Sequence, residues 1–262
     1  MTQRLFVNLQ TNTLSSQFYK RRTEMKKVLH PGSTRGSANY GWLKANYSFS
    51  FANYFNPDRL EFGMLRVLND DYIAPAMGFG QHPHADMEIV TIPMSGALHH
   101  KDSMGNEGVI YSGDIQVMSA GSGIEHSERN ASTTDPISLF QIWIVPEAKN
   151  VVPRYDQKKI ASLINPNTFS TVVRPKSEAS NGDLWIHQQA YFSIGEFTDR
   201  TTTTYQLKSI DQGAYIFVIE GEVLVDNEKL NEKDAIGVWD TSEVTVTAEK
   251  NSKVLVIEVP MN

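Results

Sequence analysis

Short apolar segments separated by glycine-containing turns recur along this chain, and this pattern constrains the fold more than any other feature. Segments such as 88–92, 139–145 and 215–219 are rich in β-branched and aromatic residues, which favour strands. Helical periodicity is scarce, and residues 155–164 form the best candidate for a short helix. Many short strands joined by Gly-rich turns are typical of β-barrels and jelly rolls, so we expect an all-β fold.

The same pattern of segments and turns occurs twice along the chain. In the first half, an apolar segment ends at Gly96 and a polar turn follows at Asp114; Gly221 and Asp234 take these places in the second half. Such internal repetition indicates duplicated units, so the sequence predicts two barrels in tandem. The expected domains are residues 28–146 and 147–262, preceded by an extension at residues 1–27.

The extension is mildly basic and ends close to Met25, which is an alternative start of translation. Whether residues 1–24 belong to the natural protein stays open at this point. Apolar residues near the N-terminus are too few for the core of a signal peptide. No stretch approaches the roughly 18 consecutive apolar residues of a membrane span, so we expect no membrane partner.

Charge and cysteine content exclude several classes of function. The chain has 24 Lys and Arg against 30 Asp and Glu, a net charge of −6, which is not the electrostatic footprint of a nucleic-acid-binding protein. Because there is no cysteine, disulfides, iron–sulfur clusters, thiolate zinc sites and cysteine nucleophiles are excluded. A chain without cysteine is compatible with a reducing compartment, and we expect a cytoplasmic protein.

Two histidine-containing pairs predict a metal site. His82 and His84 are separated by one residue, as are His126 and Glu128, and side chains at i and i+2 of a strand leave the same face. If the two strands are neighbours in a barrel, three imidazoles and one carboxylate meet inside it. Such nitrogen and oxygen donors suit Fe(II), Ni, Cu, Co, Mn or Zn. Glu88 shares the parity of the first pair and is the alternative carboxylate.

The other histidines do not show this pattern. His99 and His100 are adjacent, so they point to opposite faces of a strand and cannot both enter one site. We expect both to be exposed to solvent at a strand end. His30 and His187 lack a paired ligand pattern, and we expect no functional role for either.

The segment that carries both pairs, residues 78–130, resembles the pirin family of the cupin superfamily, and especially the bacterial pirins described as quercetin 2,3-dioxygenases. Residues 35–57, 62–71 and 141–157 are also similar to pirins, whereas residues 1–27 have no recognised counterpart. This resemblance implies two tandem cupin barrels, a bicupin, with a metal in the N-terminal barrel alone.

Carried over residue by residue, the resemblance implies metal binding by His82, His84, His126 and Glu128. In the wider cupin pattern the carboxylate comes from the first motif instead, which here is Glu88. The second barrel has no corresponding donors. Counting from Gly221 and Asp234 as in the first half leads to residues that are not metal ligands: Leu207, Ser209, Val246 and Ala248.

The resemblance further implies a dioxygenase, with Fe(II) as the expected metal, that opens the central ring of quercetin or a related flavonol with O2 and releases carbon monoxide. Glu128 is then the general base for the flavonol 3-hydroxyl. Phe79 and Met118 are candidates to line an apolar mouth of the site, with core packing as the equal alternative for both.

Two other functions stay open. One is a metal-dependent interaction module without turnover that modulates a protein partner, as animal pirins are described. The other is a metal-dependent isomerase or a different dioxygenase, because cupins host many chemistries. In either case we expect a monomer.

Overall fold

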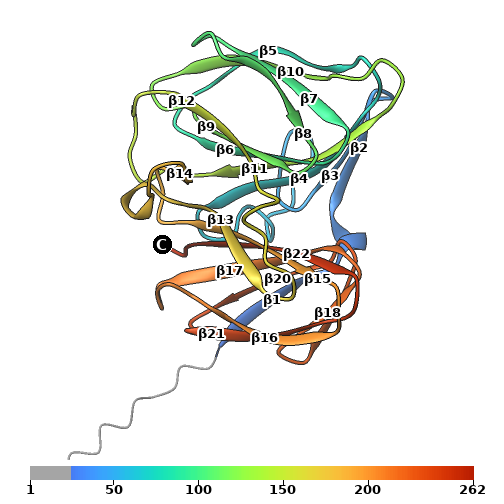
Figure 1. Ribbon diagram of the computed structural model, residues 1–262, viewed down its shortest axis with the longest axis vertical. Coiled ribbons are helices and arrows are strands. Elements are labelled where there is room, and N and C mark those ends of the chain that lie inside the picture. The colour runs from blue at the N-terminus through green and yellow to red at the C-terminus, as the bar shows by residue number, and fades with distance from the viewer. Residues whose placement is uncertain (1–24) are drawn as a thin grey trace, which may run out of the picture.

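The computed structural model describes residues 25–262, and nearly all of its regular structure is β-strand. Two barrels are stacked, one built mainly from the first half of the chain and one mainly from the second (Figure 1). This confirms the predicted all-β fold with two cupin barrels. Helical structure within residues 25–262 is limited to two 3-10 turns, at Gly32–Thr34 and Lys176–Glu178. No helix in this part of the chain is long and apolar enough to cross a membrane.

The first barrel consists of a seven-stranded sheet in the order β12-β9-β6-β11-β4-β3-β2 and a four-stranded sheet in the order β5-β10-β7-β8. The seven strands of the larger sheet are β2 (Gly36–Asn39), β3 (Leu43–Tyr47), β4 (Leu65–Ile73), β6 (Glu88–Ser95), β9 (Asp114–Ser119), β11 (Ile137–Ile144) and β12 (Arg154–Lys159). The smaller sheet contains β5 (Gly78–His84), β7 (Ala97–Asp102), β8 (Glu107–Tyr111) and β10 (Ile124–Asn130).

The second barrel repeats this architecture, with sheets in the orders β1-β20-β17-β22-β15-β13-β14 and β16-β21-β18-β19. Its larger sheet contains β1 (Lys26–His30), β13 (Phe169–Pro175), β14 (Leu184–Ile186), β15 (Tyr191–Phe197), β17 (Gln212–Glu220), β20 (Ala235–Trp239) and β22 (Ser252–Pro260). Its smaller sheet contains β16 (Thr201–Gln206), β18 (Glu222–Val225), β19 (Glu228–Asn231) and β21 (Glu243–Ala248).

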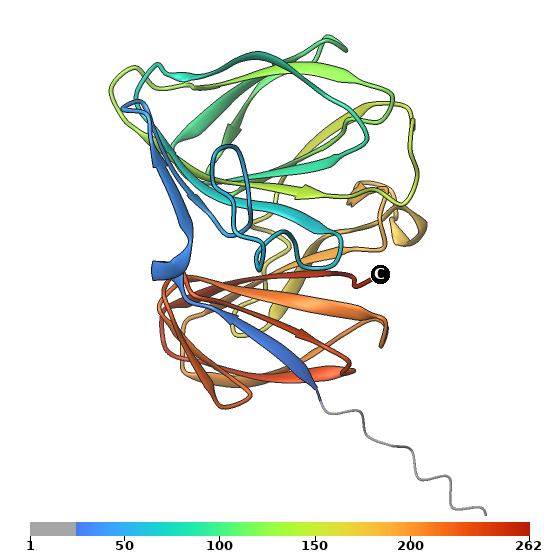
Figure 2. The same cartoon turned by 180° about the vertical axis from the view of Figure 1, so that it is seen from behind.

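Each barrel takes one edge strand from the other half of the chain. β1 pairs with β20 of the second barrel, and β12 pairs with β9 of the first. Figure 2 shows the blue β1 lying in the orange and red barrel. The predicted helix at residues 155–164 is therefore wrong, because Arg154–Lys159 pairs along its whole length with the edge of a sheet.

The exchange also bears on the predicted domains. A boundary between residues 146 and 147 stays a prediction, but the sheets do not follow it, since β12 lies beyond it and returns to the first barrel. The proposed extension at residues 1–27 ends earlier than expected, because Lys26 and Lys27 already belong to β1. Residues 1–24, and the question of whether they are native, lie outside the described residues.

The two large sheets pack face to face and bury one shared core. Val90 and Phe140 of the first barrel and Tyr215 and Phe217 of the second belong to the same buried cluster, and the rings of Phe140 and Phe217 meet edge to face with centroids 5.4 Å apart. Burial of apolar surface is the main stabilising contribution to folding, so this shared core holds the two barrels together.

The interiors of the two barrels differ in polarity although their folds agree. The second interior is filled by aliphatic residues such as Val218, Val246 and Val256. Buried polar side chains occupy the first, among them Gln116 and Gln141. Since an aliphatic filling supports the same fold, the polar lining of the first barrel is not required for folding and indicates a function there.

Candidate metal centre

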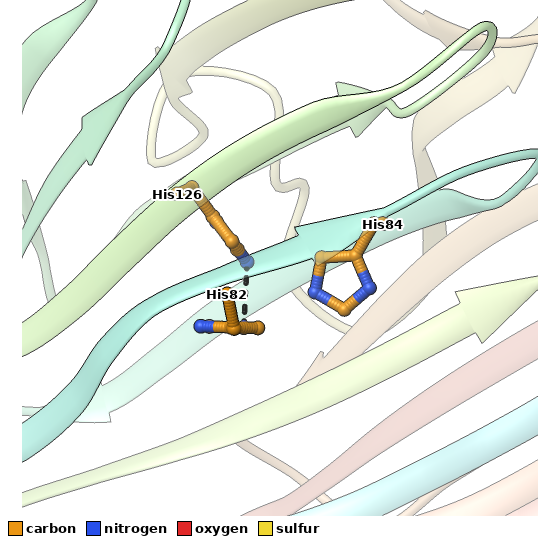
Figure 3. A group of neighbouring side chains, drawn as sticks. All are labelled: His82, His84 and His126. Atoms are coloured by element: carbon orange, nitrogen blue, oxygen red, sulfur yellow. Dashed lines mark hydrogen bonds between the residues drawn. The ribbon is translucent and has the colours of Figure 1, made fainter.

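Three imidazoles converge inside the first barrel. β5 and β10 are antiparallel neighbours with His82 opposite His126, and the Nε2 atoms of these two residues lie 3.0 Å apart. Figure 3 shows His126 reaching from β10 toward His82 and His84 on β5. One nitrogen from each of the three rings lies within 4.8 Å of the others. The period-2 alternation along β5 therefore places both of its histidines on one face, as expected.

The tautomer of His82 is set by the backbone. Its Nδ1 lies 2.7 Å from the carbonyl oxygen of Gly80, and since a carbonyl can only accept, Nδ1 carries the hydrogen. The lone pair is then on Nε2, the atom that faces His126. An imidazole that donates its far nitrogen to the backbone and offers the near one is the usual arrangement of a metal-binding histidine.

Burial favours the neutral form of two of these imidazoles, those of His84 and His126. It is the largest cause that lowers the pKa of His126 to about 2, and the neighbouring imidazoles of His82, His84 and His100 lower it further. Burial, with a contribution from His82, lowers the pKa of His84 to about 4. Neutral imidazoles with free lone pairs are ligands for a divalent cation, whereas imidazolium groups are not. The protonation states therefore fit a metal.

Glu128 lies beside His126 on β10. Its Oε2 accepts a hydrogen bond of 2.7 Å from Nε2 of Gln141, and Oε1 is buried without a partner. Burial raises the pKa of Glu128 to about 7, although the Gln141 hydrogen bond acts against the shift. One oxygen of Glu128 lies within 4.8 Å of donor nitrogens of His126 and His100, a group distinct from the three-imidazole cluster. Glu128 is thus placed to ligate a cation or to exchange a proton next to it.

A cavity of about 180 Å³ opens in front of this cluster. Its walls combine aromatic and polar side chains with the imidazoles and the carboxylate described above. The lining residues are Phe51, Asn69, Asp71, Phe79, His82, His84, Glu128, Gln141 and Trp143. An aromatic wall facing a few polar groups is typical of a site for a small planar ligand.

Sequence reasoning missed most of the cavity wall. Asn69 and Asp71 are polar residues at i and i+2 of the buried strand β4, and Gln141 interrupts the apolar run of β11. These polar residues within apolar strands were the sequence signals that could have indicated a polar cavity. Burial, reinforced by Asp70 and Glu128, raises the pKa of Asp71 to about 8, so burial favours the uncharged form of this second carboxyl group of the cavity.

Two predicted site residues lie elsewhere. Glu88 does not face the cavity: its Oε2 accepts a hydrogen bond of 2.7 Å from Ser119 on the other side of the sheet. The expected parity fails because the chain bends between β5 and β6, where Asp86 has a φ of 48°. Met118 is fully buried and packs with Ile89 and Ile124, so it belongs to the core, whereas Phe79 lines the cavity.

The expectation for His100 is wrong. His100 is fully buried, and its ring centroid lies 5.3 Å from that of His126. It faces inward, whereas its neighbour His99 faces outward, with Nε2 3.3 Å from Oε1 of Glu107. His30 is also buried, with Nδ1 3.0 Å from the hydroxyl of Tyr215. Neither His30 nor His187 belongs to the metal-capable groups within residues 25–262.

The second barrel has no such cluster within the described part of the chain. Val246 and Ala248 are buried in its apolar interior. Leu207 and Ser209 are not the structural counterparts of the first histidine pair, because both lie beyond the end of β16. The residue of β16 that lies opposite Val246 is Thr203. Spacing along the sequence failed here because the connections differ in length between the barrels.

The chain is similar to known proteins along most of its length. The family model described as "Pirin" matches residues 29–144, and the model "Quercetinase C-terminal cupin domain" matches residues 174–259. The chain is 38% identical to a quercetin 2,3-dioxygenase of Escherichia coli (strain K12), over 88% of this chain and 98% of that protein. It is also 38% identical to a pirin-like protein of Caulobacter vibrioides, over 87% of this chain and 97% of the relative.

Solved structures of related proteins also superimpose on this chain. The bacterial pirin YhhW of Escherichia coli in complex with nickel(II) superimposes with a TM-score of 0.83 at 36% identity, covering 90% of this chain and 99% of that one. A quercetin 2,3-dioxygenase of Acinetobacter baumannii has a TM-score of 0.72 at 19% identity, covering 90% of this chain and 79% of that one; this likeness shows the fold alone.

Proposed function

Because this chain belongs to the pirin family, we propose that it is a metal-dependent dioxygenase that cleaves quercetin or a related flavonol. Relatives named quercetin 2,3-dioxygenase support an enzyme of the pirin type with a small-molecule substrate and O2. In the proposed reaction one O2 is consumed per flavonol, the central ring is opened, and its C3 carbon leaves as carbon monoxide.

We assign the metal to His82, His84, His126 and Glu128, with Fe(II) as the expected ion. Three neutral imidazoles and one carboxylate leave a bound divalent ion with net positive charge, which suits Fe(II) and related metals. When bound, the ferrous ion supplies positive charge for the adjacent 3-hydroxyl and 4-keto oxygens and the redox chemistry that O2 requires.

Glu128 is the proposed base for the flavonol 3-hydroxyl. Glu128 lines the cavity, and the hydrogen bond from Gln141 to its Oε2 holds the side chain in place, so the carboxylate is oriented to accept the proton.

The aromatic residues of the cavity are proposed to hold the flavonol. Phe51, Phe79 and Trp143 line the cavity, and offset or edge-to-face contacts with the substrate rings orient a flat ligand. Phe51 and Trp143 already meet edge to face, with centroids 5.4 Å apart. Burial of the rings also removes water from the reacting carbon atoms.

The convergence of three imidazoles beside a cavity lined by aromatic residues is the observation that carries this proposal. The test is reconstitution with Fe(II) without oxygen, followed by quercetin and then O2. Loss of the flavonol absorbance band with an equal amount of carbon monoxide supports the proposal. If a fully loaded protein causes neither change, the metal serves another purpose, such as control of a protein partner.

A further inference from the structure

A fourth imidazole, that of His100, lies beside the three-imidazole cluster, with its ring centroid 5.3 Å from that of His126. His100 on β7 is directly opposite Glu128 of β10, and Asp102 is opposite His126. The ring of His100 stacks on Tyr155 with centroids 4.7 Å apart and an interplanar angle of 28°. A histidine enclosed in this way has a fixed ring position, and nothing described so far gives it a role.

The hydrogen on the His100 ring is assigned by its neighbour Asp102. Nε2 of His100 lies 3.5 Å from Oδ2 of Asp102, and because a carboxylate accepts, Nε2 carries the hydrogen. Asp102 is itself held by the backbone N–H groups of Met104 and Asn106, at 2.9 and 3.0 Å from Oδ1. Nδ1 of His100 is therefore a hydrogen-bond acceptor, and it is buried without a partner.

His126 presents the complementary atom. If Nε2 of His126 ligates a metal, the hydrogen of the neutral ring must lie on Nδ1, which is also buried without a partner. Oε1 of Glu128 is the third such atom. One ring nitrogen each of His100 and His126 and one carboxylate oxygen of Glu128 lie within 4.8 Å of one another, and two hydrogen bonds of about 2.8 Å that meet at one water span about 4.6 Å.

We propose that His100 is a positioning residue for the metal centre, linked through one buried water to Nδ1 of His126 and Oε1 of Glu128. In that arrangement His126 donates to the water, and the water donates to His100 and Glu128. Three hydrogen bonds are the usual number for a buried water. The link fixes the tautomer of His126 and the orientation of Glu128, and it rests on the metal assignment of the proposed function.

The test compares His100→Leu, His100→Gln and Asp102→Asn with His99→Gln as the matched control, since His99 is the adjacent histidine and faces outward. Binding of Zn(II) is measured by competition with a chromophoric chelator, and circular dichroism of the metal-free proteins checks folding. We expect His100→Leu to lower the affinity by about 10–100-fold, the usual effect of losing an outer partner of a ligand, and Asp102→Asn to lower it less. His99→Gln should bind as the unaltered protein does.

Nitrogen-15 spectra of the imidazoles in the Zn(II)-loaded protein report the tautomer of His126, which a general packing defect would not change. The unaltered protein should show hydrogen on Nδ1 of His126, and the Nδ1 signal should shift or exchange faster in the His100 variants. His100→Gln, which keeps a polar group at this position, should restore part of the affinity that His100→Leu loses.

The inference is overturned if folded His100→Leu keeps the unaltered affinity and the unaltered His126 signals. It is also overturned if the protein binds two metal ions per chain and His100→Leu loses one of them, because His100 would then be a ligand itself. Should His100→Leu fail to fold, His100→Gln and Asp102→Asn decide in the same way. Failure of the unaltered protein to bind metal overturns the proposed function together with this inference, which separates that case from the others.

Discussion

The Nε2 atoms of His82 and His126 lie 3.0 Å apart although the two residues are 44 positions apart in the chain. His84 lies beside them, with its ring centroid 4.9 Å from the ring centroid of each. Without a cation, one of the two facing nitrogens must carry a hydrogen. With a cation, both lone pairs are used.

His126→Ala should therefore abolish tight metal binding while the barrel stays folded. The variant removes the imidazole that connects the two strands, so we expect the Ni(II) affinity to fall by more than about 100-fold, beyond the loss caused by an outer partner. Elemental analysis after dialysis against Ni(II) measures this, with His99→Ala as the control. Retention of one ion per chain by folded His126→Ala would contradict the assignment.

Glu128→Gln and Glu88→Gln should separate the two candidate carboxylates. Glu128 lines the cavity, whereas Glu88 is bonded to Ser119 on the opposite face of the sheet. At equal metal loading, we expect Glu128→Gln to lower kcat/KM for quercetin by about 10²–10⁴-fold, the usual contribution of a general base. Glu88→Gln should stay within a few-fold of the unaltered protein, and the reverse order would show that the first-motif carboxylate is the functional one.

His30 should make the stability of the protein depend on pH. Burial, with a smaller effect from Arg59, lowers the pKa of His30 to about 4 from its ordinary 6.5. The unfolded chain thus binds a proton between these values that the folded protein does not. The contribution of His30 to the free energy of unfolding is complete above pH 6.5 and is lost as the pH falls toward 4. At pH 5 the loss is about 2 kcal/mol.

Urea unfolding of the unaltered protein and of His30→Asn at pH 7 and pH 5 measures this contribution. The Asn side chain keeps an oxygen near the position of Nδ1 but does not titrate in this range. We expect the unaltered protein to lose about 2 kcal/mol more than His30→Asn does between these two values. Equal losses would show that His30 is protonated in the folded state as readily as in the unfolded chain.

Gly237→Ala should destabilise the contact between the barrels. A Cβ at Gly237 would lie 2.4 Å from Cε2 of Phe62, and the ring of Phe62 also approaches Gly213. We expect a loss of about 1–3 kcal/mol in the free energy of unfolding, as for other overpacked cores. Gly108→Ala is the control, since a Cβ there meets no atom within 4 Å.

The smaller Phe62→Leu side chain should relieve part of that loss. The double variant Phe62→Leu/Gly237→Ala should lose about 1 kcal/mol less in the free energy of unfolding than the sum of the losses of the two single variants. The effects are coupled because the two residues are in contact. Strict additivity would mean that the ring moves freely and does not wedge between the barrels.

Much of this protein could be predicted from local sequence. β-Branched segments and glycine turns predicted the all-β fold, and period-2 spacing placed His82 with His84 and His126 with Glu128. These predictions depend on the alternation of side chains along a single strand, which is set by the backbone of that strand alone. They hold as long as the strand is unbroken.

Other features depended on contacts between distant parts of the chain, which only the tertiary structure determines. Glu88 faces away from the site because a turn at Asp86 resets the alternation between two strands, and His100 is buried because β7 lies beside β10. The exchange of β1 and β12 between the barrels likewise follows from the free edges of β20 and β9. Which strand pairs with which edge is a non-local choice, and no local pattern encodes it.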